Sequence, residues 1–304
     1  MNRRAIALLS GGLDSTLAIR LMLDQGISVE AVNFVTVFCT CTPENSTCLA
    51  SRHAAEQLGV KLHVFEASNE FLDVLKNPKH GYGRGMNPCR DCRIFMFQQA
   101  ARFMKAAHAS FLVTGEVLNQ RPMSQRPNSI RLIEREAGLE GLILRPLSAD
   151  VLPPTEPEKQ GIVDRQKLLG IQGRSRKPQI DLAKAYGMKD YPCAAGGCRL
   201  TEPGFARRMR DLMDHSPDFD VHDVNLLRLG RHIRIDDDAK LIVGRDQKEN
   251  ERLTKLTRDG DTFFSPVNVK GPVAIGRGFF DKARREYAAN VVARYAKTAD
   301  GAVV

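Results

Sequence analysis

The sequence contains no tryptophan, and aromatic residues make up only 6% of its 304 residues. No dense aromatic platform for stacking single-stranded nucleic acid is therefore evident. No apolar run approaches the roughly 20 residues that a membrane-spanning helix needs. The first residues, MNRRAIALLSGG, begin like a signal peptide, but their apolar part stops after about five residues, short of the usual 7–15. We therefore expect a cytoplasmic protein with no membrane partner.

The remaining composition is that of an ordinary globular chain, with 42% hydrophobic and 27% charged residues. Its formal net charge of +9 favours a polyanionic partner such as RNA. The chain also carries seven cysteines, most of them in clusters. In a cytoplasmic enzyme, clustered cysteines indicate metal binding or redox chemistry before structural disulfides.

Short apolar runs and helical patterns alternate through the first part of the chain. Strands are predicted at 3–9, 28–38, 60–67 and 110–116, and helices at 13–26, 46–59 and 90–107. Strands that alternate with helices form parallel βαβ units, so we predict an α/β fold with a doubly wound parallel sheet. Further helices are expected around 158–170 and 179–187, after a Pro-rich segment.

The last third of the chain has a different texture. Residues 202–217 form a predicted bridging helix, and short β-like runs, an Asp-rich turn and helices follow it, which indicates a small α+β domain. The predicted organisation is a first domain over 1–200, a bridging helix or linker over 201–221, and a second domain over 222–304.

The first predicted strand runs into Ser10-Gly11-Gly12-Leu13-Asp14-Ser15, and a helix follows directly. A glycine-rich turn between a strand and a helix builds an anion site, because backbone N–H groups can approach a phosphate and the helix dipole favours negative charge. A carboxylate would repel that phosphate unless Mg²⁺ bridges the two or the carboxylate orients the loop. The loop lacks the Gly-Lys-Ser/Thr ending of a Walker motif.

The Ser-Gly-Gly-x-Asp-Ser pattern resembles the signature of the PP-loop ATP pyrophosphatases, which cleave ATP between its α and β phosphates. The resemblance implies an adenine nucleotide alpha-hydrolase-like fold that binds ATP and Mg²⁺ at residues 10–15. It also implies a reaction in which a substrate oxygen attacks the α-phosphate and a second nucleophile then displaces AMP. A helix cap without a ligand is the structural alternative.

A second motif, MNPCRDCRIFMF, places Cys89 and Cys92 at the start of a predicted helix. Two thiolates at this spacing can share a metal ion or cluster, and the helix N-terminus would lower their pKa. A third thiolate is available from Cys193 or Cys198, and we favour Cys198 because its Gly-Gly-Cys turn gives the backbone room. Three cysteines on a [4Fe–4S] cluster leave one iron open for a hydrosulfide. A Cys₄ Zn²⁺ site of all four, or a redox disulfide between the first two, are the alternatives.

Asn-Pro-x-x-x-Cys followed by a helix resembles the tRNA 2-thiouridylases, a thiouridine-forming branch of the PP-loop family. The resemblance implies that Cys92 works with a distant second cysteine. Cys89 stands where these enzymes often have Asp, and this departure favours a version that carries a cluster.

Two further segments resemble the same enzymes. Thr114, Gly115 and Glu116 end a predicted strand and would face the nucleotide crevice. GRSRKPQ at 173–179 resembles a basic segment on the substrate side. The basic stretch 121–145 is either an RNA track or a solvated helix face.

The three remaining cysteines, Cys39, Cys41 and Cys48, follow the second predicted strand. They could carry a persulfide, help a metal site or be structural, and the pattern assigns them no role.

Residues from about 222 onward resemble the small RNA-binding domain at the end of NFACT-type proteins, on the stretches 231–256 and 260–278. Basic side chains at Arg231, Arg234, Arg245 and Lys248 would suit phosphate contacts. A plain structural appendage or a dimer interface is the alternative.

These features predict an ATP-dependent tRNA sulfurtransferase with Cys92, Cys198 and Asp14 as catalytic residues. Its partners would be tRNA and a sulfur donor, which is a desulfurase, a persulfide carrier or sulfide; a homodimer is left open. Two rival functions remain: a PP-loop enzyme that sulfurates or amidates a small metabolite, and a non-catalytic RNA-binding subunit of a modification complex.

Overall fold

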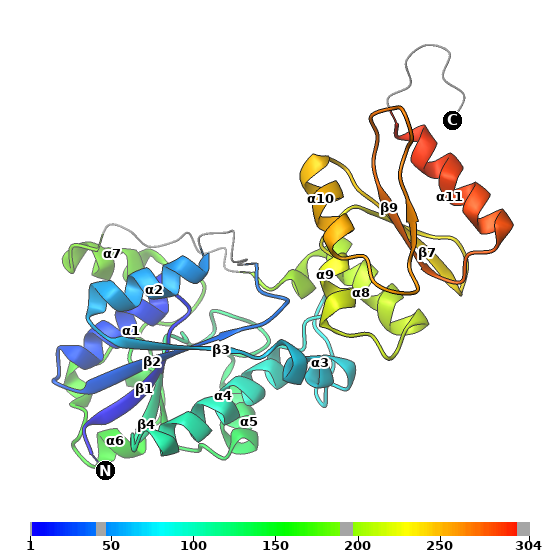
Figure 1. Cartoon of the computed structure of the whole chain (residues 1–304). Coiled ribbons are helices and arrows are strands. Elements are labelled where there is room, and N and C mark those ends of the chain that lie inside the picture. Colours follow the sequence, from blue (N-terminus) through cyan, green and yellow to red (C-terminus); the bar gives the residue numbers. More distant parts are fainter. Residues whose placement is uncertain (1, 41–46, 189–196, 297–304) are drawn as a thin grey trace. The chain divides into compact units, whose positions relative to one another are not determined.

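A computed structural model describes residues 2–40, 47–188 and 197–296 of the chain. The chain divides into two compact units, Met1–Thr201 and Glu202–Val304 (Figure 1). The predicted bridging helix belongs to the second unit, where it forms α8, Pro203–His215. None of the helices in the described ranges combines the length and apolar character that a bilayer crossing requires.

The first unit is built on a five-stranded sheet with the strand order β3-β2-β1-β4-β5, in which every pairing is parallel. The strands are β1 Arg4–Leu8, β2 Ser28–Val35, β3 Lys61–Glu66, β4 Phe111–Thr114 and β5 Ile143–Leu144. The chain starts at the central strand, proceeds to one edge, and returns to build the other. This confirms the predicted doubly wound parallel sheet.

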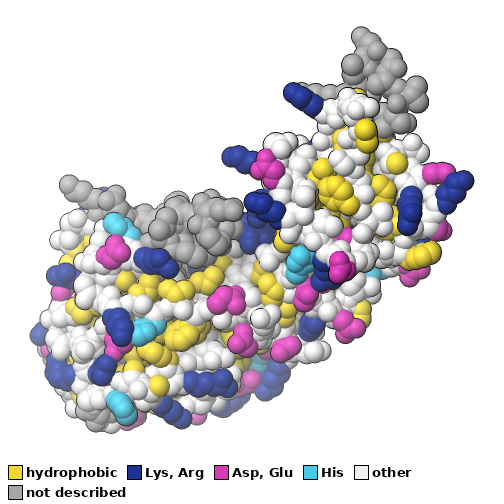
Figure 2. Space-filling view, in the orientation of Figure 1, with side chains coloured by type: hydrophobic (Ala, Val, Ile, Leu, Met, Phe, Trp, Pro, Cys, Tyr) yellow, Lys and Arg dark blue, Asp and Glu magenta, His cyan; other side chains and the backbone are white. Residues whose placement is uncertain are grey.

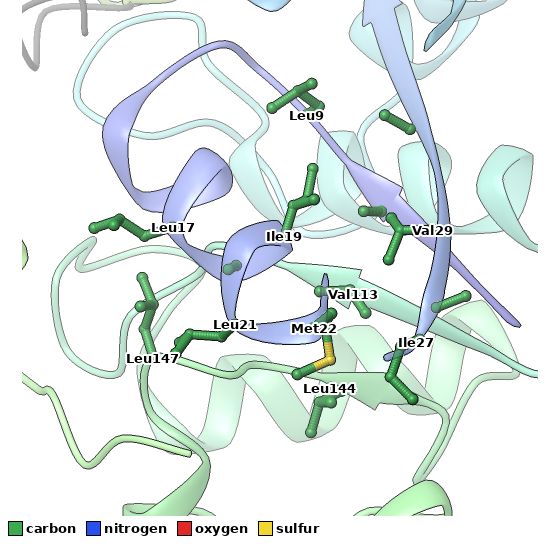
Figure 3. Close-up of a cluster of buried hydrophobic side chains, with 14 of the residues drawn as sticks. Leu9, Leu17, Ile19, Leu21, Met22, Ile27, Val29, Val113, Leu144 and Leu147 are labelled. Atoms are coloured by element: carbon green, nitrogen blue, oxygen red, sulfur yellow. The ribbon is translucent and has the colours of Figure 1, made fainter. Parts of the chain in front are cut away.

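Helices cover both faces of this sheet (Figure 1). The principal ones are α1 Leu13–Leu23, α2 Thr47–Leu58, α3 Ser68–Lys76, α4 Cys89–Ala106, α5 Pro127–Ala137 and α7 Lys177–Ala185. Strand β1 shows why two cores form: Ala5 and Ala7 pack with α1 and α7, while Ile6 and Leu8 pack with α4. Successive side chains of a strand point to opposite faces, so a strand covered on both sides is apolar throughout. Figure 3 shows the first of these cores.

The helix predicted around 158–170 is wrong. The structure has only the short α6, Glu156–Lys159, and a 3₁₀ turn at Arg165–Lys167 in that region. Gly161 has a φ of +68°, a left-handed conformation that ends a helix. Helix α5 lies within the basic stretch for which a helix face was one of two interpretations. It begins with Pro127 in its first turn and ends at Gly138, which has the same left-handed conformation.

The second unit is a small α+β fold, as predicted. Its antiparallel sheet has the order β6-β7-β9-β8. The strands are β6 Arg231–Arg234, β7 Ala239–Val243, β8 Thr262–Phe264 and β9 Ala274–Gly278, and the helices beside α8 are α9 Val221–Leu226, α10 Gln247–Lys255 and α11 Lys282–Arg294. Helix α11 packs on one face of the sheet through Ala288 and Val292, and α10 packs on the other face through Leu253.

Candidate active site

The predicted ATP loop lies between the end of β1 and the start of α1. Gly11 has a φ of +76°, and a Cβ there would lie 2.5 Å from the backbone of Ala50 and Ser51, so glycine is required. Gly12 caps α1 without any side-chain hydrogen bond to the helix amides. Unpaired amides at a helix start are donors for a phosphate. The loop therefore presents backbone donors at the centre of the sheet.

The hydroxyl groups of the loop are held in place by one another. Ser15 Oγ donates to the carbonyl oxygen of Gly12 at 2.8 Å and lies 3.2 Å from Ser10 Oγ. Thr16 Oγ1 also donates to this carbonyl, at 3.1 Å. The side chain of Leu13 is buried in the core beneath the loop. These contacts fix the loop before any ligand binds.

Asp14 is held from two separate segments of the chain. Gln120 Nε2 donates to Asp14 Oδ2 at 3.1 Å, and Arg176 Nη2 lies 3.7 Å from Asp14 Oδ1. Arg176 belongs to the basic stretch 173–179, so the structure brings that segment to the ATP loop. The Oδ1 atom is buried and accepts no hydrogen bond from the described residues. A buried carboxylate oxygen without a donor is chemically suited to coordinate Mg²⁺.

The end of β4 packs directly on this loop. A Cβ at Gly115 would lie 2.4 Å from the backbone of Asp14 and Ser15, so only glycine permits the contact. Thr114 is buried beside it. Glu116 is also buried, and its two oxygens pair with Arg93 Nε and Arg145 Nε, each at 3.1 Å. Glu116 thus faces arginines behind the crevice, and its predicted contact with a cofactor stays a prediction.

A cluster of four thiols forms where three chain segments meet. Cys89 and Cys92 occupy the first turn of α4. Cys39 and Cys198 are paired in an isolated antiparallel bridge, next to a hydrogen bond from the Arg199 amide to the Phe38 carbonyl at 2.9 Å.

The loop before α4 packs against the segment that carries Cys198. The Met86 amide donates to the Leu200 carbonyl at 2.9 Å. A Cβ at Gly85 would lie 2.2 Å from this carbonyl oxygen, so the approach requires glycine. Asn87 Nδ2 lies 3.1 Å from the Cys89 sulfur and donates to it. The Asn-Pro pair of the motif therefore orients the first cysteine of the cluster.

The pKa values of two thiols oppose the expectation from the helix N-terminus. Burial raises the pKa of Cys92 to about 12, and the positive charge of Arg93 only partly offsets this. Burial likewise raises the pKa of Cys198 to about 12, against a hydrogen bond from the Leu200 backbone. Desolvation disfavours the thiolate more than the helix dipole stabilises it. The negative charges of neighbouring cysteines, Cys39 among them, add to both shifts.

The cluster contains a residue to which the sequence assigned no role, Cys39. Among the described residues, no three or more His, Cys, Asp or Glu side chains are arranged to hold a single metal ion. A zinc site needs its sulfur ligands about 2.3 Å from one ion. A four-iron cluster is larger and holds its thiolates further apart, and thiols are its usual ligands. The donor chemistry therefore suits an iron–sulfur cluster. Cys41, Cys193 and the Cys48 side chain lie outside the described part of the chain.

Arg121 connects the two halves of the site electrostatically. Partial burial and the neighbouring charge of Arg93 lower its pKa, while the charges of Cys89 and Asp14 act in the opposite direction. Gln120 and Arg121 follow the Thr-Gly-Glu segment directly in the sequence, and they could have been proposed from that position. The contact of Arg176 with Asp14 could not, because it joins residues 162 positions apart.

The site can be compared with known proteins. Residues 1–182 match the family model described as "Thiamine biosynthesis protein (ThiI)", and residues 230–304 match the model "NFACT protein RNA binding domain". A tRNA-specific 2-thiouridylase MnmA from Marinobacter nauticus is 24% identical over 89% of this chain and 74% of its own length. A probable tRNA sulfurtransferase from Ureaplasma urealyticum is 33% identical over 62% of this chain and 46% of its own length.

Two solved structures are similar in part. A 4-thiouridine synthetase in complex with RNA and ATP has a TM-score of 0.43 at 18% identity, and covers 74% of this chain and 52% of its own. The U34-tRNA thiolase NcsA from Methanococcus maripaludis, solved with its [4Fe–4S] cluster, has a TM-score of 0.37 at 16% identity, over 75% of this chain and 71% of its own.

Proposed function

Since this chain belongs to the ThiI family, we propose that it is an ATP-dependent enzyme that replaces a carbonyl oxygen of a tRNA uridine with sulfur. One observation carries the proposal: the first unit places an ATP loop at residues 10–15 and a cluster of four thiols on the same scaffold, with charges from both acting on Arg121. An adenylating loop makes an oxygen a leaving group, and sulfur ligands beside it provide the nucleophile.

The first chemical step uses the loop. The uridine carbonyl oxygen attacks the α-phosphate of ATP, the bond between the α and β phosphates breaks, and pyrophosphate leaves. Backbone amides at Gly11, Gly12 and the start of α1 would stabilise the negative charge of the phosphates. Asp14 Oδ1 would bind Mg²⁺, which neutralises the charge that develops on pyrophosphate. Arg176 keeps Asp14 oriented toward the loop.

In the second step a sulfur nucleophile attacks the activated carbon of the base and AMP leaves with the original oxygen. When bound, a [4Fe–4S] cluster on Cys89, Cys92 and Cys198 would hold the sulfur that is transferred. Ligation would also convert the buried, neutral thiols of Cys92 and Cys198 into thiolates and release their protons. Asn87 orients Cys89, while the Cys39–Cys198 bridge holds the distant cysteine beside α4.

The second unit would supply tRNA affinity, because it matches an RNA-binding domain model. The sulfur donor and the number of subunits in solution are not assigned by these residues. A cytoplasmic location remains a prediction from the sequence.

The proposal is tested with purified protein, bulk tRNA and ATP. We expect tRNA to stimulate the release of AMP and pyrophosphate, and sulfide to yield a thiolated nucleoside. The Cys92→Ala variant should bind ATP with unchanged affinity and form no thiolated product. Release of AMP that depends on a small metabolite and ignores tRNA would support the rival enzyme function. RNA binding without any pyrophosphate release would support the non-catalytic one.

A further inference from the structure

The second unit contains a hollow with a strong excess of positive charge. It has a volume of about 440 Å³ and is lined by parts of α8, β6 and β7. We call it the arginine hollow; its basic residues are Arg207, Arg208, Arg231, Arg234, Lys240 and Arg245. Asp211 is the one acidic residue in its lining. Three of the four basic residues expected to contact phosphate lie here, whereas Lys248 does not line it.

Two carboxylates neutralise only part of this charge. Asp211 accepts from Arg234 Nε at 2.9 Å and Nη2 at 2.8 Å, and it also pairs with Lys240. Glu249 pairs with Arg245. Six cations less these two carboxylates leave four positive charges around one concave surface. A hollow of one sign concentrates the field, so it attracts a polyanion.

The paired cations have a different role from the unpaired ones. Asp211 fixes Arg234 and Lys240 against the wall of the hollow, so their positions are set before a ligand arrives. Arg207 is exposed and forms no ion pair with any residue in the described ranges. A guanidinium without an intramolecular acid is the natural donor for a phosphodiester, which it can bind with two hydrogen bonds.

A second hollow adjoins the first. It has a volume of about 400 Å³ and shares Arg231 and Arg245 with the arginine hollow. The Arg231 guanidinium lies 4.5 Å from the centroid of the Tyr295 ring, and the tyrosine is 43% exposed. A stacked arginine and an exposed aromatic ring form a surface on which a nucleobase can pack. Lys270 adds a further cation to this lining.

We propose that the two hollows form one RNA-binding track, in which the arginine hollow binds phosphodiesters of the tRNA and the Arg231–Tyr295 stack contacts a neighbouring nucleoside. Helix α8 forms one wall of the track, although it precedes residues 230–304, which match the RNA-binding domain. The track is therefore larger than that domain. This inference rests on tRNA as the substrate of the proposed function.

The test compares tRNA binding by the full-length wild type, an Arg207→Ala/Arg231→Ala variant and a charge-matched control, Lys255→Ala/Lys282→Ala. The two control lysines are exposed on α10 and α11 and line neither hollow. Dissociation constants are measured by fluorescence anisotropy over a range of salt concentrations, with circular dichroism to check folding. Neither changed arginine pairs with an acid, so the variant should remain folded.

The arginine variant should bind tRNA about tenfold more weakly or worse, and the slope of log K against log[salt] should fall by roughly 1.4–1.8, the value for two lost phosphate contacts. The control should stay within about twofold of the wild type. Equal affinity and equal slope for both variants would overturn the track while leaving tRNA as the substrate. A wild type that binds no tRNA would overturn the track and the proposed function together. Loss of binding in Arg207→Ala alone would show that α8 takes part.

Discussion

At the scale of single residues, the two adjacent glycines of the ATP loop are required for different reasons. Gly11 has a left-handed backbone and no space for a Cβ, because the backbone at Ala50 and Ser51 lies 2.5 Å away. Gly12 has an extended backbone, and a Cβ there would meet only Ser10 Oγ at 3.5 Å. The first glycine serves the fold, and the second leaves the loop open for a phosphate.

Substitution of the two glycines should separate stability from ligand binding. Gly11→Ala should lower the free energy of unfolding by at least about 1–2 kcal/mol, the cost of a left-handed backbone for a residue with a Cβ. Gly12→Ala should keep the wild-type melting temperature and bind ATP more weakly. Thermal unfolding and calorimetric ATP titration measure the two effects. A Gly12→Ala protein that melts as early as Gly11→Ala would show that both glycines serve the fold.

His232 predicts a pH dependence in the second unit. Burial, with the charges of Lys240 and Arg208, lowers the pKa of this ring to about 3. The unfolded chain binds a proton near pH 6.5 and the folded chain does not, so stability is full above pH 6.5 and falls as the pH drops toward 3.

The change that tests this is His232→Gln, which keeps a donor for the Leu229 carbonyl but does not titrate. The wild type should lose up to about 1.4 kcal/mol more of its free energy of unfolding per pH unit than the variant does below pH 6.5. Denaturant unfolding of both proteins between pH 7 and 4 gives the two slopes. Parallel slopes would mean that the ring is protonated in the folded state.

At the scale of elements, a buried charge network joins the helices on one face of the first sheet. Glu116 follows β4, pairs with Arg93 of α4, and pairs with Arg145, which in turn pairs with Glu134 of α5. Glu116 and Arg145 are 2% and 3% exposed, so neither charge can be solvated by water if its partner is removed. The network holds α4, and with it the first two cysteines, against the sheet.

Removal of the central carboxylate should therefore be costly. We expect Glu116→Ala to lower the free energy of unfolding by about 3–5 kcal/mol, because two arginines lose a buried partner. The control Glu140→Ala removes an exposed carboxylate and should change stability by less than about 0.5 kcal/mol. Urea denaturation of both variants measures the difference. A Glu116→Ala protein as stable as the control would show that the arginines are solvated.

Local patterns in the sequence were sufficient for the sheet and the ATP loop. Apolar strands, glycines and helix periodicity are short-range signals, and they located β1 to β4, the loop and the first turn of α4. The sequence could not show that Cys39 lies beside Cys198, because their pairing depends on long-range packing between Met86 and Leu200. The high pKa of Cys92 was missed for the same reason: burial is a property of the fold, whereas proximity to a helix start is visible in the motif.

At the scale of the whole molecule, the chain divides its tasks between two units with separate cores. The first unit carries the ATP loop and the thiols, and the second carries the basic hollows. Figure 2 shows Lys and Arg side chains spread over the visible faces of both units. The formal charge of +9 alone therefore does not locate an RNA site, whereas the concave arrangement of the arginine hollow does.

The central claim, thiolation of tRNA, is tested most directly by mass spectrometry of nucleosides from total tRNA. Cells that lack the gene are compared with the parent strain and with cells that carry the wild-type gene or its Cys92→Ala variant. The account predicts that one thiolated nucleoside disappears in the deletion strain, returns with the wild-type gene and does not return with the variant. Restoration of that nucleoside by Cys92→Ala, or a thiolated nucleoside profile unchanged by the deletion, would contradict it.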